Sequence, residues 1–170
     1  MQTFSIVFIA ALALATATRV WLALRHLDHV RRHRDAVPAE FARDISLDTH
    51  RHAADYSCAK TQLGLISSLF ECALLLALTF GGALQWLADL TAGWFDPGVM
   101  RGVALLVLLG ALSSVLDLPF AWYRTFTIER RFGFNKMTPR MFVVDTLKNA
   151  AIAAALGIPL AACILWVMER

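Results

Sequence analysis

The sequence predicts an all-α, polytopic membrane protein with four transmembrane helices and two helical cytoplasmic loops. Two observations support this class. First, 58% of the 170 residues are hydrophobic and only 17% are charged, whereas about 25% are charged in an ordinary soluble domain. Second, four apolar segments approach or exceed the roughly 20 residues that a helix needs to cross a bilayer. The mean hydropathy of +0.59 agrees with both, so the composition argues against a soluble globular domain.

The first predicted span covers residues 3–24, TFSIVFIAALALATATRVWLAL. Arg19 lies near its end, where a long side chain can carry its charge to the interface. A cleaved signal peptide is the alternative, because the run ALATATRV contains small residues suited to a cleavage site. However, no basic residue precedes Arg19, and the apolar run is longer than the usual signal-peptide core. We therefore expect a retained span.

The other three predicted spans cover residues 63–90, 99–118 and 150–168. Pro119 directly follows the third span and is expected to kink or end it, because proline lacks a backbone donor. Residues 1–170 are thus predicted to form a single membrane domain.

Small residues four positions apart occur in two of these spans. Such spacing is typical of faces along which helices pack closely, although it also arises by chance in an alanine-rich chain. The pairs are Gly110 with Ser114 and Ala153 with Gly157.

The basic residues gather in the two long connections, residues 25–62 and 119–147. The first contains Arg25, Arg31, Arg32, Arg34, Arg43, Arg51 and Lys60, and the second, with the residue that follows it, contains Arg124, Arg130, Arg131, Lys136, Arg140 and Lys148. The short connection between the second and third spans holds only acids until Arg101. Because basic loops remain cytoplasmic, both long loops are expected inside and the N-terminus outside. The net charge of +3 is modest. Because the basic residues gather in two loops beside the spans, they indicate the lipid bilayer with its anionic head groups as a partner, and no nucleic acid.

Both long loops carry helix signals. In the first, VPAEF at residues 37–41 predicts a turn at Pro38, and Ser46 predicts the N-cap of a helix that continues into the second span. In the second, FAWYRTFTIERRF mixes aromatic and basic residues, which suits the membrane interface. Gly133 is expected to break that segment. Thr138 and Pro139 then predict a new helix start that leads into the fourth span.

Two carboxylates lie in or beside the apolar segments. Glu71 is inside the second span, where a carboxylate is costly unless it meets water, a proton or a partner. It is predicted either to line a cavity and handle protons, or to form a structural hydrogen bond between helices. Asp117 is close to the membrane edge and could pair with Arg124 or another cation of the loop.

The histidines and cysteines give no strong catalytic signal. One candidate metal site is His26, His29 and His33, which share a helical spacing, and a second is His50 and His52, which lie near Asp48 and Asp55. A metal site and a solvated helix surface are both open at each place. The interpretation we favour is the solvated surface, with three free thiols, no metal and no cofactor in this chain. The chain contains no HExxH, no nucleophile elbow and no phosphate-binding glycine loop, so no catalytic residue is predicted.

The segment from Leu118 to Lys148, LPFAWYRTFTIERRFGFNKMTPRMFVVDTLK, resembles the N-terminal membrane region of the type I CAAX prenyl proteases, which are integral-membrane zinc metallopeptidases. The resemblance rests on these positions in order: LP, Tyr123, F-x-IE ending at Glu129, FGFNK at 132–136, Thr138, Asp145 and Lys148. In the first loop, VPAEF, Tyr56 and Lys60 occur in the matching order.

The resemblance implies that the chain is the front portion of a larger enzyme that hydrolyses peptide bonds of membrane-associated or prenylated substrates. In the family, a later region supplies HExxH and a further glutamate as zinc ligands. Zinc is therefore expected only in a full-length member, and the expected partner is that C-terminal metalloprotease region, in the same or a separate chain. The chain alone is predicted to be inactive, and its composition is typical of a bacterial inner-membrane protein.

The resemblance also implies that this chain forms part of the wall of a membrane chamber. The residues predicted to line it or to support the zinc site from outside are Glu71, Asp117, Glu129, Asn135 and Asp145. The alternative is a non-catalytic four-span scaffold, or a partner of a separately encoded protease half.

Overall fold

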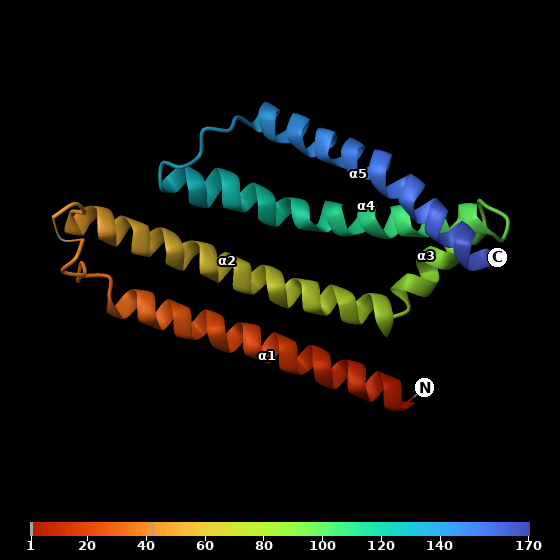
Figure 1. The fold of residues 1–170 in the computed structure, drawn as a ribbon, viewed down its shortest axis with the longest axis horizontal. Helices are drawn as coiled ribbons and strands as arrows, with labels where there is room; N and C mark the ends of the chain where they lie inside the picture. The colour runs from red at the N-terminus through yellow and green to blue at the C-terminus, as the bar shows by residue number, and fades with distance from the viewer. Residues whose placement is uncertain (1, 42) are drawn as a thin grey trace. The chain divides into compact units, whose positions relative to one another are not determined.

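The computed structural model describes residues 2–41 and 43–170, and all regular structure within these ranges is helical (Figure 1). The elements are α1 (Gln2–Arg32), α2 (Leu47–Thr79), α3 (Ala83–Ala92), α4 (Val99–Tyr123), the π-helix η1 (Arg124–Glu129) and α5 (Pro139–Glu169). Four helices are long and apolar enough to cross a membrane, namely α1, α2, α4 continued by η1, and α5. The predicted all-α class with four spans is confirmed.

The chain divides into two compact units. Unit 1 comprises Met1–Leu75 and Phe120–Asn135, and unit 2 comprises Leu76–Pro119 and Lys136–Arg170.

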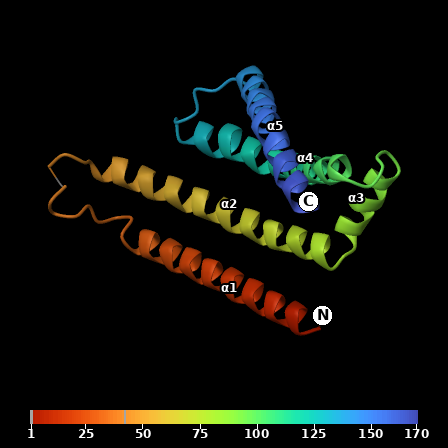
Figure 2. The same ribbon diagram turned by 45° about the vertical axis from the view of Figure 1, so that its right-hand side comes forward.

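Unit 1 is built on an antiparallel hairpin of α1 and α2, and the two helices lie side by side in both views (Figures 1 and 2). Thr16 Oγ1 donates to Cys72 Sγ at 3.4 Å in the apolar half. Leu27 is only 5% exposed in the polar half. The hairpin loop follows the predicted signals, because Phe41 N donates to Pro38 O at 2.9 Å.

Both helices of the hairpin extend past the apolar segments. At about 1.5 Å per residue, the 31 residues of α1 are longer than the roughly 30 Å hydrocarbon layer. Ser46 is the N-cap of α2, as predicted, and its Oγ accepts from Thr49 N at 3.2 Å. Most of the loop 25–62 is thus helix that continues beyond the apolar segments.

The predicted second span, residues 63–90, is wrong as a single helix. It ends at Thr79, and α3 begins at Ala83. Phe80 N and Gly81 N both donate to Leu76 O, at 2.8 and 3.3 Å, and Gly82 takes a left-handed φ of 75°. A Cβ on Gly81 would lie 2.6 Å from the carbonyl oxygen of Ala77, so this helix end requires glycine.

Pro119 does not end the third span, which was predicted to cover residues 99–118. α4 continues to Tyr123 and passes directly into η1. Proline removes only one backbone donor, and the helical bonds on either side persist. The fourth predicted span, 150–168, lies inside α5, whose start is capped as expected by Thr138 Oγ1, which accepts from Met141 N at 3.2 Å.

Within unit 2, α4 and α5 approach closely at a glycine that the sequence did not single out. A Cβ on Gly102 would lie 2.8 Å from Leu165 Cδ1. By contrast, a Cβ on Gly110 or Gly157 would meet no described atom within 4 Å. The predicted packing faces at Gly110 and Gly157 are therefore not formed among the described residues, and Gly102 fills that role.

We expect Gly102→Leu to destabilise the chain by about 1 to 3 kcal/mol, because the added side chain overlaps Leu165. Gly102→Ala should cost less, since the end of a leucine side chain can move. The free energy of unfolding is measured by titration of dodecyl sulfate into detergent micelles. Gly110→Leu is the matched control, and an equal loss in both leucine variants would refute the close approach.

Candidate functional site

The candidate site centres on residues 124–135, here called the connector. It starts as η1, whose π-helical geometry is rare and is often found at functional positions. The helix ends at Gly133, which has a left-handed φ of 76°. The Glu129 carbonyl accepts from Phe134 N at 2.8 Å and from Asn135 N at 3.1 Å. The predicted break at glycine is confirmed, and it closes the last helical turn with backbone bonds.

Aromatic side chains fix the connector to the polar half of α2. The Phe132 ring is 8% exposed. Its centroid lies 5.1 Å from that of His52 and 5.5 Å from that of Tyr56, both edge-on. The Phe134 ring also contacts Tyr56, and the centroids of these two rings lie 4.7 Å apart. We call His52, Tyr56, Phe132 and Phe134 the aromatic clasp. Edge-on ring pairs at such distances are favourable beyond their buried area.

Buried side chains and one ring contact hold the start of the connector. Thr125 and Ile128 of η1 are both buried. Just before η1, the Phe120 ring lies 5.2 Å from that of Phe70 on α2. The segment 120–134 is thus an ordered part of unit 1, in keeping with its aromatic composition.

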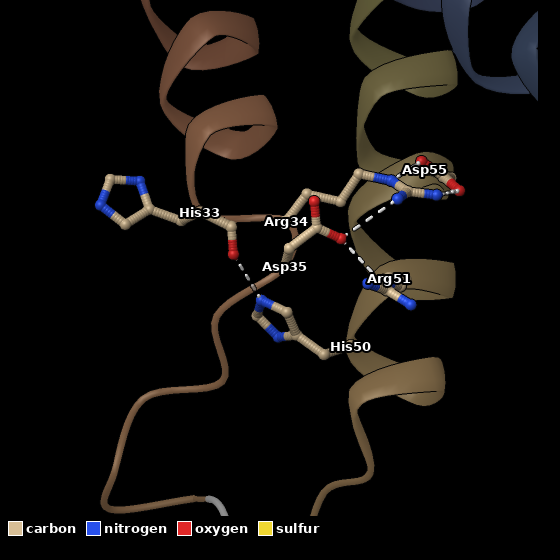
Figure 3. Close-up of polar contacts among 6 residues, drawn as sticks. All are labelled: His33, Arg34, Asp35, His50, Arg51 and Asp55. Atoms are coloured by element: carbon tan, nitrogen blue, oxygen red, sulfur yellow. Dashed lines mark hydrogen bonds and ion pairs between the residues drawn. The ribbon is translucent and has the colours of Figure 1, made fainter.

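An ion-pair network joins the end of α1 to the start of α2 (Figure 3). Arg34 donates to both carboxylate oxygens of Asp55, at 2.7 and 2.8 Å. Asp35 accepts from Arg51 Nε at 2.6 Å and from Arg34 at 3.4 Å. Such two-pronged arginine–carboxylate pairs are geometrically specific as well as favourable.

Asp55 links this network to the aromatic clasp. It lies on α2 between His52 and Tyr56 in the sequence. The hydrogen bonds from Arg34 are the main cause that lowers the pKa of Asp55 below its ordinary value. Partial burial acts in the opposite direction, and the charges of Arg34 and of Arg131 in the connector lower the pKa further. The same pair raises the pKa of the Arg34 guanidinium.

The predicted site residues fall into separate places. Glu129 and Asn135 come together at the turn of the connector. Glu129 is half-buried and lies 3.9 Å from Arg124. The pairing of Asp117 with Arg124 or another cation of the loop stays a prediction. Asp117 is exposed on α4 and Asp145 is half-buried on α5, and both belong to unit 2.

Glu71 is exposed on α2 and accepts from Ser67 Oγ at 3.3 Å. This bond lies within one helix, so the predicted bond between helices is not observed in the described part of the chain. The alternative, a carboxylate that lines a cavity, stays a prediction.

The histidines do not converge on one point. His26 Nε2 lies 3.3 Å from Ser57 Oγ, His33 Nδ1 lies 2.9 Å from His29 O, and His50 Nε2 lies 3.0 Å from His33 O. No three or more His, Cys, Asp or Glu side chains among the described residues are grouped so that they could hold a metal ion.

Comparison with known proteins identifies the class to which this fold and connector belong. Residues 26–170 match the family described as the CAAX prenyl protease N-terminal region with five membrane helices. The chain therefore belongs to this family, as the resemblance of the connector predicted. Its described part contains four long apolar helices and the shorter α3.

Particular relatives support this assignment. The chain is similar to a CAAX prenyl protease 1 homolog of Caenorhabditis elegans, with 30% identity over 96% of this chain and 37% of that protein. It is 29% identical to the Arabidopsis thaliana homolog, over 74% of this chain and 31% of that protein. The crystal structure of S. mikatae Ste24p has the same fold, with a TM-score of 0.86 and 23% identity over 96% of this chain and 39% of that chain. The chain thus spans between 31% and 39% of the length of these proteins.

We expect Phe132→Ala to destabilise unit 1 by about 3 kcal/mol, because it removes a buried ring from the clasp. Trypsin should then cut after Arg130 and Arg131 faster than in the parent chain, since the connector opens locally more often. Cleavage rate and the free energy of unfolding are measured together. The 57% exposed Phe134 supplies the control Phe134→Ala, which should cost less. Equal rates for Phe132→Ala and the parent chain would refute the anchoring.

The Arg34–Asp55 pair makes stability depend on pH. Because the pKa of folded Asp55 is lowered, its contribution is fully present above about pH 4 and is lost as the pH falls through the lowered value. Asp55→Asn should therefore reduce stability at pH 7 and flatten the decline between pH 5 and pH 2, as measured by unfolding midpoints. Asp28→Asn, which removes an exposed pair with Arg32, is the control. A decline in Asp55→Asn as steep as in the parent chain would rule out this origin.

Proposed function

We propose that this chain forms the N-terminal membrane module of a metalloendopeptidase that hydrolyses peptide bonds in membrane-associated or prenylated polypeptides. The main support is the connector, because the residues that resemble the family form one anchored structure. Phe132 and Phe134 of the FGFNK run pack on Tyr56 of the first loop. Two separate parts of the resemblance therefore meet in space.

The reaction itself belongs to a region that lies outside the 170 residues. In enzymes of this kind a bound zinc ion polarises the scissile carbonyl and lowers the pKa of a bound water. The described residues provide no group that could hold this ion, so we assign no catalytic step to them. The partner we propose is a C-terminal metalloprotease region, in the same chain or in a second one.

The contribution proposed for this chain is structural support. The clasp would hold the connector in a fixed place beside the protease region. Glu129 and Asn135, at the turn of the connector, would then act as positioning residues. Asp145, on α5 after the connector, is a further candidate of the same kind.

The positions of two carboxylates are an argument for a chamber that contains water. Glu71 and Asp117 are both exposed on helices apolar enough to cross a membrane. A carboxylate exposed to hydrocarbon is costly, so such groups normally meet water or a partner. We propose that each faces the interior of a chamber completed by the rest of the enzyme.

The basic loops support an orientation with residues 25–62 and 119–147 in the cytoplasm and the N-terminus outside. The composition, rich in alanine and arginine, supports a bacterial inner membrane. The clasp and the ion-pair network would then lie on the cytoplasmic side. The alternative function is a non-catalytic scaffold, which would need the same fold but no protease region.

The test is reconstitution of peptide-bond hydrolysis in proteoliposomes. The chain is joined to, or expressed with, the zinc protease region of a relative, and cleavage of a fluorescent prenylated peptide is followed. We expect hydrolysis to require residues 1–170, and Asn135→Ala to lower kcat about tenfold with unaltered unfolding, as for groups that support a metal site from outside.

Asn149→Ala, an exposed change on α5, is the matched control. Labelling of Lys136→Cys from each side of the same liposomes checks the orientation. Unaltered turnover in Asn135→Ala removes the positioning role, and hydrolysis that does not need residues 1–170 favours the scaffold.

A further inference from the structure

Three of the six arginines in residues 25–62 are engaged by carboxylates. Arg32 lies 2.9 Å from Asp28, and the network in Figure 3 engages two more. Those two are Arg34, paired with Asp55, and Arg51, paired with Asp35. Their charge is therefore largely neutralised within the protein.

Arg25 and Lys60 are different. Neither forms an ion pair with any described residue, and both are exposed. Each lies over an aromatic ring instead. Arg25 Cζ is 5.5 Å from the centroid of Trp21, and Lys60 Nζ is 6.0 Å from that of Tyr56. Cation–π contact holds the head of a basic side chain in place but leaves its charge available to an anion.

The two side chains occupy the same level of the hairpin. His26 lies against Ser57 at 3.3 Å. Arg25 precedes His26 by one residue, and Lys60 follows Ser57 by three. With a rise of 1.5 Å per residue in antiparallel helices, the two Cα atoms lie within about 3 Å of one level.

That level coincides with the polar ends of the apolar segments, where the edge of the hydrocarbon layer is expected. The apolar segment of α1 ends directly before Arg25, and that of α2 begins three residues after Lys60. Trp21, which is 57% exposed, lies one helical turn deeper than Arg25. An exposed indole at this depth is typical of the layer of head groups.

We propose that Arg25 and Lys60 form a binding site for the phosphate of an anionic phospholipid. A lipid phosphate occupies the depth at which the two cations lie, and its acyl chains can cover the exposed Trp21. A soluble phosphate compound would gain nothing from this depth or from the indole. This site is independent of the proposed peptidase function.

The test uses the 170-residue chain in liposomes that contain spin-labelled phosphatidylglycerol or phosphatidylcholine. The parent chain should bind the anionic lipid preferentially. Arg25→Gln with Lys60→Gln should lower that preference roughly fivefold or more, as expected for basic residues at the membrane surface. The charge-preserving pair Arg25→Lys with Lys60→Arg should retain it.

Arg32→Gln with Arg51→Gln is the matched control, because it removes the same charge from arginines that carboxylates engage, and it should change the preference little. Circular dichroism verifies that each variant folds. The proposal is overturned if the glutamine pair keeps the preference or if the control pair loses as much. It is also overturned if glycerol phosphate at millimolar concentration displaces the labelled lipid, which would indicate a site for soluble phosphates.

Discussion

The hydrocarbon layer cannot hydrogen-bond to a peptide group, and this constraint determines most of the structure. Every backbone donor and acceptor within a span must be satisfied by the helix itself. The chain can therefore change direction only where the last carbonyl groups of a helix find other donors, which often requires a glycine with a left-handed backbone. Gly82 provides such an end after α2, with a left-handed backbone, and Gly133 ends the connector in the same conformation outside the hydrocarbon layer. Pro119 is tolerated within α4 for the same reason, because the surrounding helical bonds have no competitor in lipid.

Outside the bilayer, the polar half of the hairpin must hold itself together by its own side chains. The bidentate Arg34–Asp55 pair fixes the end of α1 to α2, and the clasp fixes the connector to the same part of α2. Both depend on a single stretch of α2, from His52 to Tyr56. The connector thus gains its position from a helix that is itself positioned by the membrane, which is why a short polar segment between two spans can be ordered.

The spans, both loop helices and their caps could be predicted because they depend on local patterns. Hydrophobic length gives the spans, and Ser46 and Thr138 give the helix starts. The break at Phe80–Gly82 was missed because the residues around it are as apolar as a span, so hydropathy alone shows no end there. Gly102 was missed because close packing depends on which face of α4 meets α5, and this cannot be inferred from a spacing of small residues.

In the candidate site, too, the local motifs could be predicted from the sequence but the contacts between them could not. The motif that carries Glu129 and Asn135 was recognised in the sequence, and so was Tyr56, but their contacts were not. His52 was considered as a metal ligand, yet its ring packs on Phe132. Asp55 was noted only as an acid near histidines, because its partner Arg34 is 21 residues away. Pairing between residues of a helical hairpin depends on how the two helices are shifted along each other. The sequence predicts where each helix ends but does not predict this shift.

The clasp and the network hold the same region by interactions that respond differently to the surroundings. The ion pairs are partly exposed, so salt screens them, and acid removes the charge of Asp55. The contact between the Phe132 and Tyr56 rings depends on excluded water, so salt and acid affect it little. The carbonyl of Glu129, which closes the turn before Asn135, follows directly on η1 and is therefore fixed mainly by the buried side chains Thr125, Ile128 and Phe132. The turn at Glu129 should therefore keep its position in high salt or acid, although these conditions weaken the ion pairs that hold the end of α1. The connector and the hairpin thus depend on different interactions.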